Sequence, residues 1–198
     1  MTIEERTYTV YSWDDLPEEG KAKALEKYRD INLDTWEPEQ WIDTDFARDV
    51  LTLPSCYELL KIGYCISYGQ GDGASGKLDV TSIKDVLNYY LHRLPKLRHL
   101  LKITDWLSSF GGNENHSYRN YTHYSYIGIE LDDHSGRYER IESVLNSLEE
   151  LMKEDCVTFN SELFLHLRKD YEYLQDDEAV IDTLKANEFM FTIDGCID

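Results

Sequence analysis

The longest regular pattern of apolar residues in the chain lies in its C-terminal half. From Ile141 to Leu174, apolar residues recur at intervals of three or four positions, which is the spacing of one buried face of a helix. The pattern predicts one helix of about 35 residues and about 50 Å, either continuous or kinked near Val157 and Thr158.

Shorter stretches of the same spacing predict further helices. Leu25, Tyr28 and Ile31 indicate a helix that begins near Pro17. Two more are expected at residues 82–94 and 176–184, the first of them ended by a proline.

A second N-terminal helix is expected between about Thr35 and the proline at position 54. Its buried stripe is predicted to consist of Ile42, Phe46, Val50 and Leu53, which follow one another at helical spacing.

Residues 57–80 show a period of two instead of a helical period. Large residues at 62, 64, 66 and 68 alternate with small ones, and glycines at 69, 71, 73 and 76 follow. This pattern predicts a strand, a glycine-rich turn and a second strand. Two interpretations remain open: a plain hairpin, or a loop that presents Gln70, Asp72 and Ser75 to a ligand or partner.

The segment from His116 to Glu130 is rich in aromatic and β-favouring residues, which predicts one strand or a tight pair ending near Leu131. Weaker alternation at residues 7–13 and 188–193 indicates short terminal strands. Together these patterns predict an α+β fold in which a small, mostly antiparallel sheet packs with helices, including one long C-terminal helix. With 198 residues, a single domain over 1–198 is expected, and a second small lobe is compatible with the length.

The charge is unevenly distributed along the chain. The formal net charge is -19, with an excess of acids in the N- and C-terminal thirds and a slight excess of bases in the middle. A surface of this kind repels the phosphates of nucleic acid, so direct nucleic-acid binding is not expected. It would attract a protein with a basic surface, or it could serve solubility alone.

The remaining composition indicates a cytoplasmic protein. No apolar run is long enough for a membrane span, and the N-terminus lacks the features of a secretion signal. The four cysteines are widely spaced and form no CxxC pair, so they are expected to be free thiols, with no metal site and no cofactor.

Four segments resemble a known family, and one of them, LPEEGKAKALEKYRDINLD at residues 16–34, resembles that family's first helix. SYGQGDGASG, at residues 67–76, resembles the W-S-Q-G-D-G-A-S-F signature of small acidic bacteriophage and prophage proteins, with Gly76 in place of an aromatic residue. NENHSYRNYTHYSY, at 113–126, is similar to that family's S-G-R-Y-x-H-x-x-x-M segment, without the Ser-Gly before Arg119. The C-terminal segment, 171–198, is similar to its Y-E-Y-L…A-N-E-Y-x-F-T-x-D-G ending.

The resemblance implies a phage or prophage origin and action in the cytoplasm of the host cell. Members of that family are often labelled antitoxins, and small acidic phage proteins often resemble inhibitors of host defence, including anti-CRISPR proteins and DNA mimics. The leading hypothesis is therefore a binding protein that blocks a basic host protein through acids of the long helix. The expected surface comprises Glu142, Glu149, Glu150, Glu154, Asp155 and Glu162.

Two other hypotheses remain open. An enzyme or ligand-binding site could combine Gln70, Asp72 and Ser75 with Arg119 and His123; in it His123 would act as a base, Asp72 would orient it, and Arg119 would hold an anion. His116 is a further candidate for this site. A structural role in the virion is the third hypothesis, although the chain lacks repeats.

Overall fold

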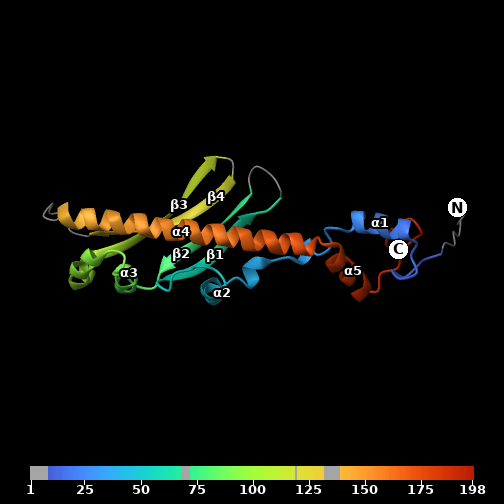
Figure 1. Ribbon diagram of the computed structural model, residues 1–198, viewed down its shortest axis with the longest axis horizontal. Helices are drawn as coiled ribbons and strands as arrows, with labels where there is room; N and C mark the ends of the chain where they lie inside the picture. The colour runs from blue at the N-terminus through green and yellow to red at the C-terminus, as the bar shows by residue number, and fades with distance from the viewer. Residues whose placement is uncertain (1–8, 68–71, 119, 132–138) are drawn as a thin grey trace, which may run out of the picture. The chain divides into compact units, whose positions relative to one another are not determined.

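The protein is α+β, as the sequence predicts, and it comprises two compact units (Figure 1). The computed structural model describes residues 9–67, 72–118, 120–131 and 139–198, with only the backbone described at 111–118, 120–126, 139 and 140. The larger unit is Glu37–Leu167, and the smaller unit combines Met1–Trp36 with Arg168–Asp198.

Two antiparallel hairpins form the β-structure of the larger unit. Strands β1 (Tyr57–Cys65) and β2 (Gly73–Val80) pair with each other, as do β3 (Leu107–Tyr118) and β4 (Asn120–Leu131). They are two separate two-stranded sheets, with β2 packed beside β4, where the sequence pattern predicted a single sheet. The aromatic segment at 116–130 is confirmed as part of a pair of strands that ends at Leu131.

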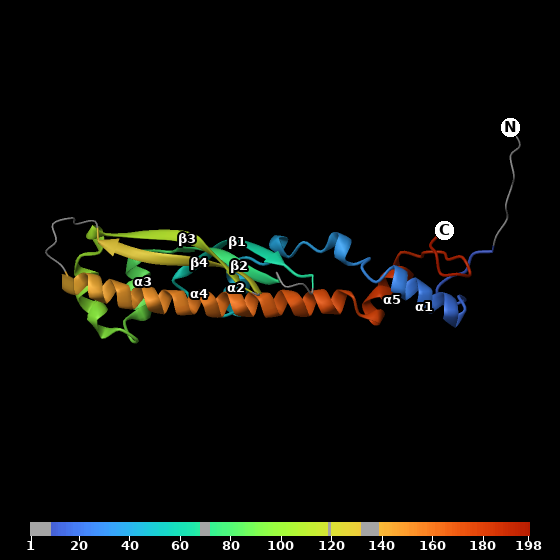
Figure 2. The same ribbon diagram turned by 90° about the horizontal axis from the view of Figure 1, so that it is seen from above.

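Helix α4 (Glu139–Leu174) is the longest element, and its 36 residues confirm the predicted long helix as a continuous one. Figure 2 shows both hairpins alongside it. Within the larger unit, its buried apolar residues follow the 3–4 spacing of an amphipathic helix. They are Leu145, Leu148, Met152, Cys156, Phe159, Leu163 and Leu167.

Hairpin β1–β2 approaches α4 most closely at Gly76. The backbone N–H of Gly76 donates to Oδ1 of Asn160, a buried polar residue of α4, at 2.9 Å. A Cβ atom at position 76 would lie 2.6 Å from Cε1 of Phe159 and 2.7 Å from Cδ1 of Leu59. Glycine is therefore required for packing at this position.

Shorter helices complete the larger unit. They are η2 (Pro38–Gln40), α2 (Thr44–Asp49), α3 (Ile83–Tyr90), η3 (Pro95–Lys102) and η4 (Thr104–Trp106). The predicted helix from about residue 35 is wrong in its extent, because the Asp43 carboxylate caps α2 by accepting from the Phe46 N–H at 2.9 Å. Ile42 and Leu53 are buried as expected, but Val50 is 54% exposed because it lies at the end of this short helix.

The smaller unit packs helices α1 (Glu18–Lys27) and α5 (Asp177–Ala186) around its own apolar core, and η1 (Leu33–Thr35) also belongs to it. The core consists of Trp13, Leu16, Ala24, Val180, Leu184 and Phe191. The predicted terminal strands are reduced to isolated bridges, in which Tyr11 and Phe191 exchange two backbone hydrogen bonds of 2.8 Å.

Replacing Gly76 with alanine should destabilise the larger unit by about 1–3 kcal/mol, because the added methyl group has no space between Phe159 and Leu59. The matched control is Gly63→Ala on the partner strand, where a Cβ would meet nothing within 4 Å. That variant should change the free energy of unfolding by less than about 1 kcal/mol. Urea unfolding of both variants is the measurement, and equal effects would contradict the close approach of β2 to α4.

Candidate functional site

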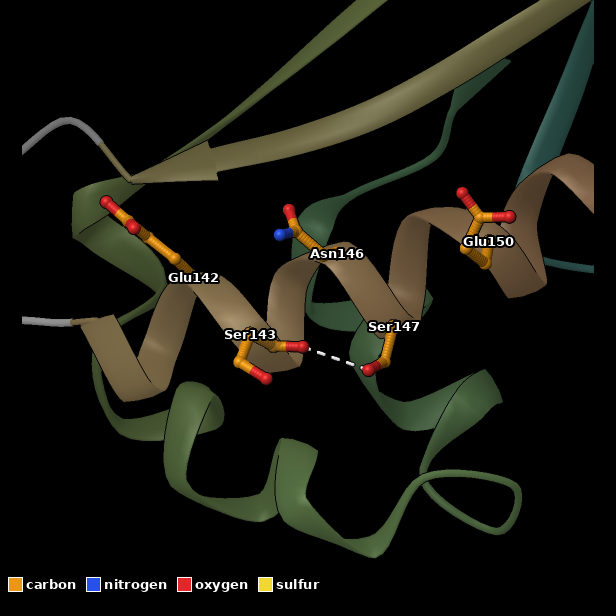
Figure 3. A pocket seen from close by; sticks show the side chains of 5 residues that line it. All are labelled: Glu142, Ser143, Asn146, Ser147 and Glu150. Carbon is orange, nitrogen blue, oxygen red and sulfur yellow. Dashed lines mark hydrogen bonds between the residues drawn. The ribbon is translucent and has the colours of Figure 1, made fainter.

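The exposed face of the N-terminal half of α4 carries a shallow polar hollow. It has a volume of about 430 Å³ and is lined by Glu142, Ser143, Asn146, Ser147 and Glu150 (Figure 3). Ser147 donates its hydroxyl proton to the backbone carbonyl of Ser143 at 2.9 Å, so this contact stays within the helix. We call these five residues the polar face of α4.

Glu142, Asn146 and Glu150 occupy successive turns of the helix, because they are spaced four residues apart. Figure 3 shows their side chains on one side of α4, with Ser143 and Ser147 on another. The two carboxylate positions are about 12 Å apart along the helix axis. This arrangement suits two basic side chains of one partner, with the amide of Asn146 between them.

The other predicted acids of α4 differ in exposure and in pairing. The Glu150 side chain is 75% exposed, and that of Glu149 is 26% exposed. Both lie near Lys153 Nζ, at 3.8 and 3.5 Å, so part of their charge is compensated within the helix. Glu162 is half-buried. Glu142 is exposed and has no ion pair with any residue that the structure describes.

Asp155 is structural rather than outward-facing. Its side chain is 18% exposed, and its carboxylate accepts from the Tyr90 hydroxyl at 2.7 Å and from Arg93 Nη1 at 2.8 Å. Because Tyr90 donates its only hydroxyl proton to Asp155, the 2.9 Å contact between Tyr57 and Tyr90 requires Tyr57 to donate. Burial raises the pKa of both tyrosines, so they remain neutral donors.

Arg93 connects two acids of α4 to the end of α3. Its second terminal nitrogen donates to Glu154 at 2.9 Å, and its guanidinium lies 5.7 Å from the centre of the Tyr90 ring. The hydrogen bond to Asp155 raises the pKa of Arg93, which therefore keeps its charge. Sequence reasoning identified neither Tyr90 nor Arg93 as a partner of Asp155, since nothing local to either residue indicates an acid more than sixty positions away.

Two buried thiols lie in the larger unit. Burial raises the pKa of both Cys56 and Cys156 to about 12. Neither thiol is therefore suited to nucleophilic chemistry at neutral pH.

Asp72 and Ser75 are the two residues of the predicted composite site whose side chains the structure describes. Asp72 accepts from the backbone N–H and the hydroxyl of Ser67, at 3.0 and 3.1 Å, and so joins the two ends of the turn. Ser75 lies in β2 opposite Gly63. Gln70 and Arg119 lie outside the described residues.

The register of the second hairpin places His123 opposite Asn115 and His116 opposite Thr122. The side chains of the two histidines lie outside the described part of the structure, so their expected approach to Asp72 stays a prediction. Within the residues described, no three His, Cys, Asp or Glu side chains are grouped as a metal site would require. Likewise, no helix in the described part has the length and apolar character needed to cross a membrane.

Replacing Asp155 with alanine should destabilise the protein by about 1.5–3 kcal/mol, because the hydroxyl of the buried Tyr90 and the guanidinium of Arg93 lose their charged acceptor. Glu154→Ala is the matched control, since Glu154 bonds the same arginine but its side chain is 65% exposed. The control should cost at most about 1 kcal/mol. Urea unfolding compares the two, and similar losses would show that Asp155 is a surface acid.

Comparison with known proteins supports a family assignment without a function. No curated protein and no solved structure matches the chain significantly. A protein family described as a domain of unknown function, DUF8835, matches residues 50–177. That range covers both hairpins, α3 and the whole of α4, and it is well over half of the chain. The chain belongs to the DUF8835 family.

Proposed function

We propose that this protein is a phage- or prophage-encoded acidic binding protein that inhibits or neutralises a host protein with a basic, nucleic-acid-binding surface. Such a protein would act in the host cytoplasm as an inhibitor of host defence, of the anti-CRISPR or DNA-mimic kind, or as an antitoxin. The observation that carries the proposal is the polar face of α4, where Glu142 and Glu150 are exposed on one side of a rigid helix.

The charge of α4 supports this surface. Within the larger unit the helix contains seven acids against one lysine and one arginine. The apolar stripe faces the core, so the exposed acids add to the negative potential of the opposite side. Glu142 has no ion pair within the described residues, and Lys153 compensates the charge of Glu150 only in part. A potential of one sign speeds encounter with a partner of the opposite sign, and salt screens it.

The shape of the face also favours recognition of a protein. The hollow is open and polar, and a helix fixes the spacing of its carboxylates before any partner arrives, which lowers the entropic cost of binding. The resemblance of the QGDGAS and ANEF segments to small acidic phage proteins favours a host target.

The test is capture of host proteins from lysate at low and high salt, with the wild-type chain and Glu142→Lys/Glu150→Lys as baits. We expect a basic partner that binds at low salt, is released at high salt, and binds the double variant at least tenfold more weakly. Affinity for the purified partner then measures the loss directly.

The matched control is Glu178→Lys/Asp182→Lys, which changes the net charge equally at two exposed positions of α5. It should bind the partner within about twofold of wild type, because both positions lie outside the polar face of α4 and the variant changes only the net charge. Equal losses in both double variants would indicate net charge rather than α4 as the cause. A partner that binds the α4 variant normally would contradict the proposed surface.

A further inference from the structure

A second cavity of different chemistry lies between η3 and the first turns of α4. Its volume is about 410 Å³, within the range of small-molecule sites. It is lined by Lys96, His99, Leu100, Ile141, Ser143 and Val144, so among the described residues no acid lines it.

The floor of this cavity is aliphatic. Leu100 is 2% exposed, and Ile141 and Val144 are half-buried. Lining residues of this kind bind an alkyl chain through burial of apolar surface. The described lining includes no Phe, Tyr or Trp, and the one aromatic ring among these residues is the imidazole of His99, which lies on the exposed rim rather than on the floor.

The rim of the cavity is basic. Lys96 and His99 are exposed on η3, and Arg98 and Lys102 of the same helix are also exposed. No ion pair within the described residues involves Lys96, Arg98 or Lys102, although the chain as a whole carries a net charge of -19. Lys96, which has no acidic partner among the described residues, and His99 lie beside an aliphatic floor, and this arrangement is complementary to an amphiphilic anion.

We propose that this cavity binds a small aliphatic anion, such as a medium-chain fatty carboxylate or alkyl phosphate. The alkyl chain lies over Leu100, Ile141 and Val144. The anionic head lies at Lys96 and His99, with the Ser143 hydroxyl as a further donor. The proposal is independent of partner binding by the polar face of α4, because the two hollows are lined by different residues. Among those described, they share only Ser143.

The probe is octanoate, titrated into the full chain by calorimetry at low salt. We expect saturable binding of one octanoate per chain. Octanol has the same chain without the charge, and inorganic phosphate has charge without the chain, so each should bind at least tenfold more weakly. Equal binding of octanol or of phosphate would overturn the proposal.

Two variants test the two halves of the cavity. Lys96→Gln/His99→Gln removes the two basic side chains that line the cavity, both at exposed positions, and should weaken octanoate binding at least tenfold. Val144→Phe fills the floor and leaves every charge in place, and it should weaken binding to a similar extent. Lys84→Gln, an exposed lysine of α3 outside the cavity lining, is the control and should bind as wild type does.

Thermal unfolding of each variant establishes that it is folded before binding is compared. Unchanged octanoate affinity in both cavity variants would overturn the assignment of the site. Binding to vesicles of anionic lipid with no binding of free octanoate would also overturn it, and would make the basic cluster of η3 a contact for lipid surfaces.

Discussion

The burial of one face of α4 is the constraint on which the larger unit depends. Seven residues of that face are nearly or completely inaccessible to solvent, and both hairpins lie alongside the helix. The contact at Gly76 shows how closely the surfaces approach, since a single methyl group would collide with Phe159. At the same point the buried amide of Asn160 accepts a backbone hydrogen bond, which fixes the position of β2 along the helix.

The same constraint decides where the acids of α4 lie. An unpaired carboxylate is costly to bury, so the acids lie off the apolar stripe unless a cation accompanies them. Asp155 is the instructive case: it is largely buried and is matched by Arg93 and Tyr90. Glu142 and Glu150, by contrast, are exposed on the polar face. Acids that are close in sequence therefore have different roles, and only part of the negative charge is accessible to a partner.

Much of the fold was predictable because its signals are local. The 3–4 spacing of α4 and the alternation at residues 57–80 each depend on neighbours in sequence, and both elements are present as expected. The candidate site was less predictable. The pairing of Asp155 with Arg93 joins residues 62 positions apart in the sequence. The helix expected to begin near residue 35 instead begins after Asp43, whose carboxylate caps α2, although the apolar spacing indicated an earlier start. The basic cavity combines η3 with α4, so no single segment reveals it.

The central claim is that a basic protein contacts the polar face of α4, and zero-length carbodiimide crosslinking tests it most directly. The reagent joins carboxylates only to amines in direct contact, and mass spectrometry then identifies the joined residues. With the partner captured from host lysate, the account predicts crosslinks from Glu142 and Glu150 to lysines of the partner. Crosslinks confined to acids of α1 or α5, with none from α4, would contradict it.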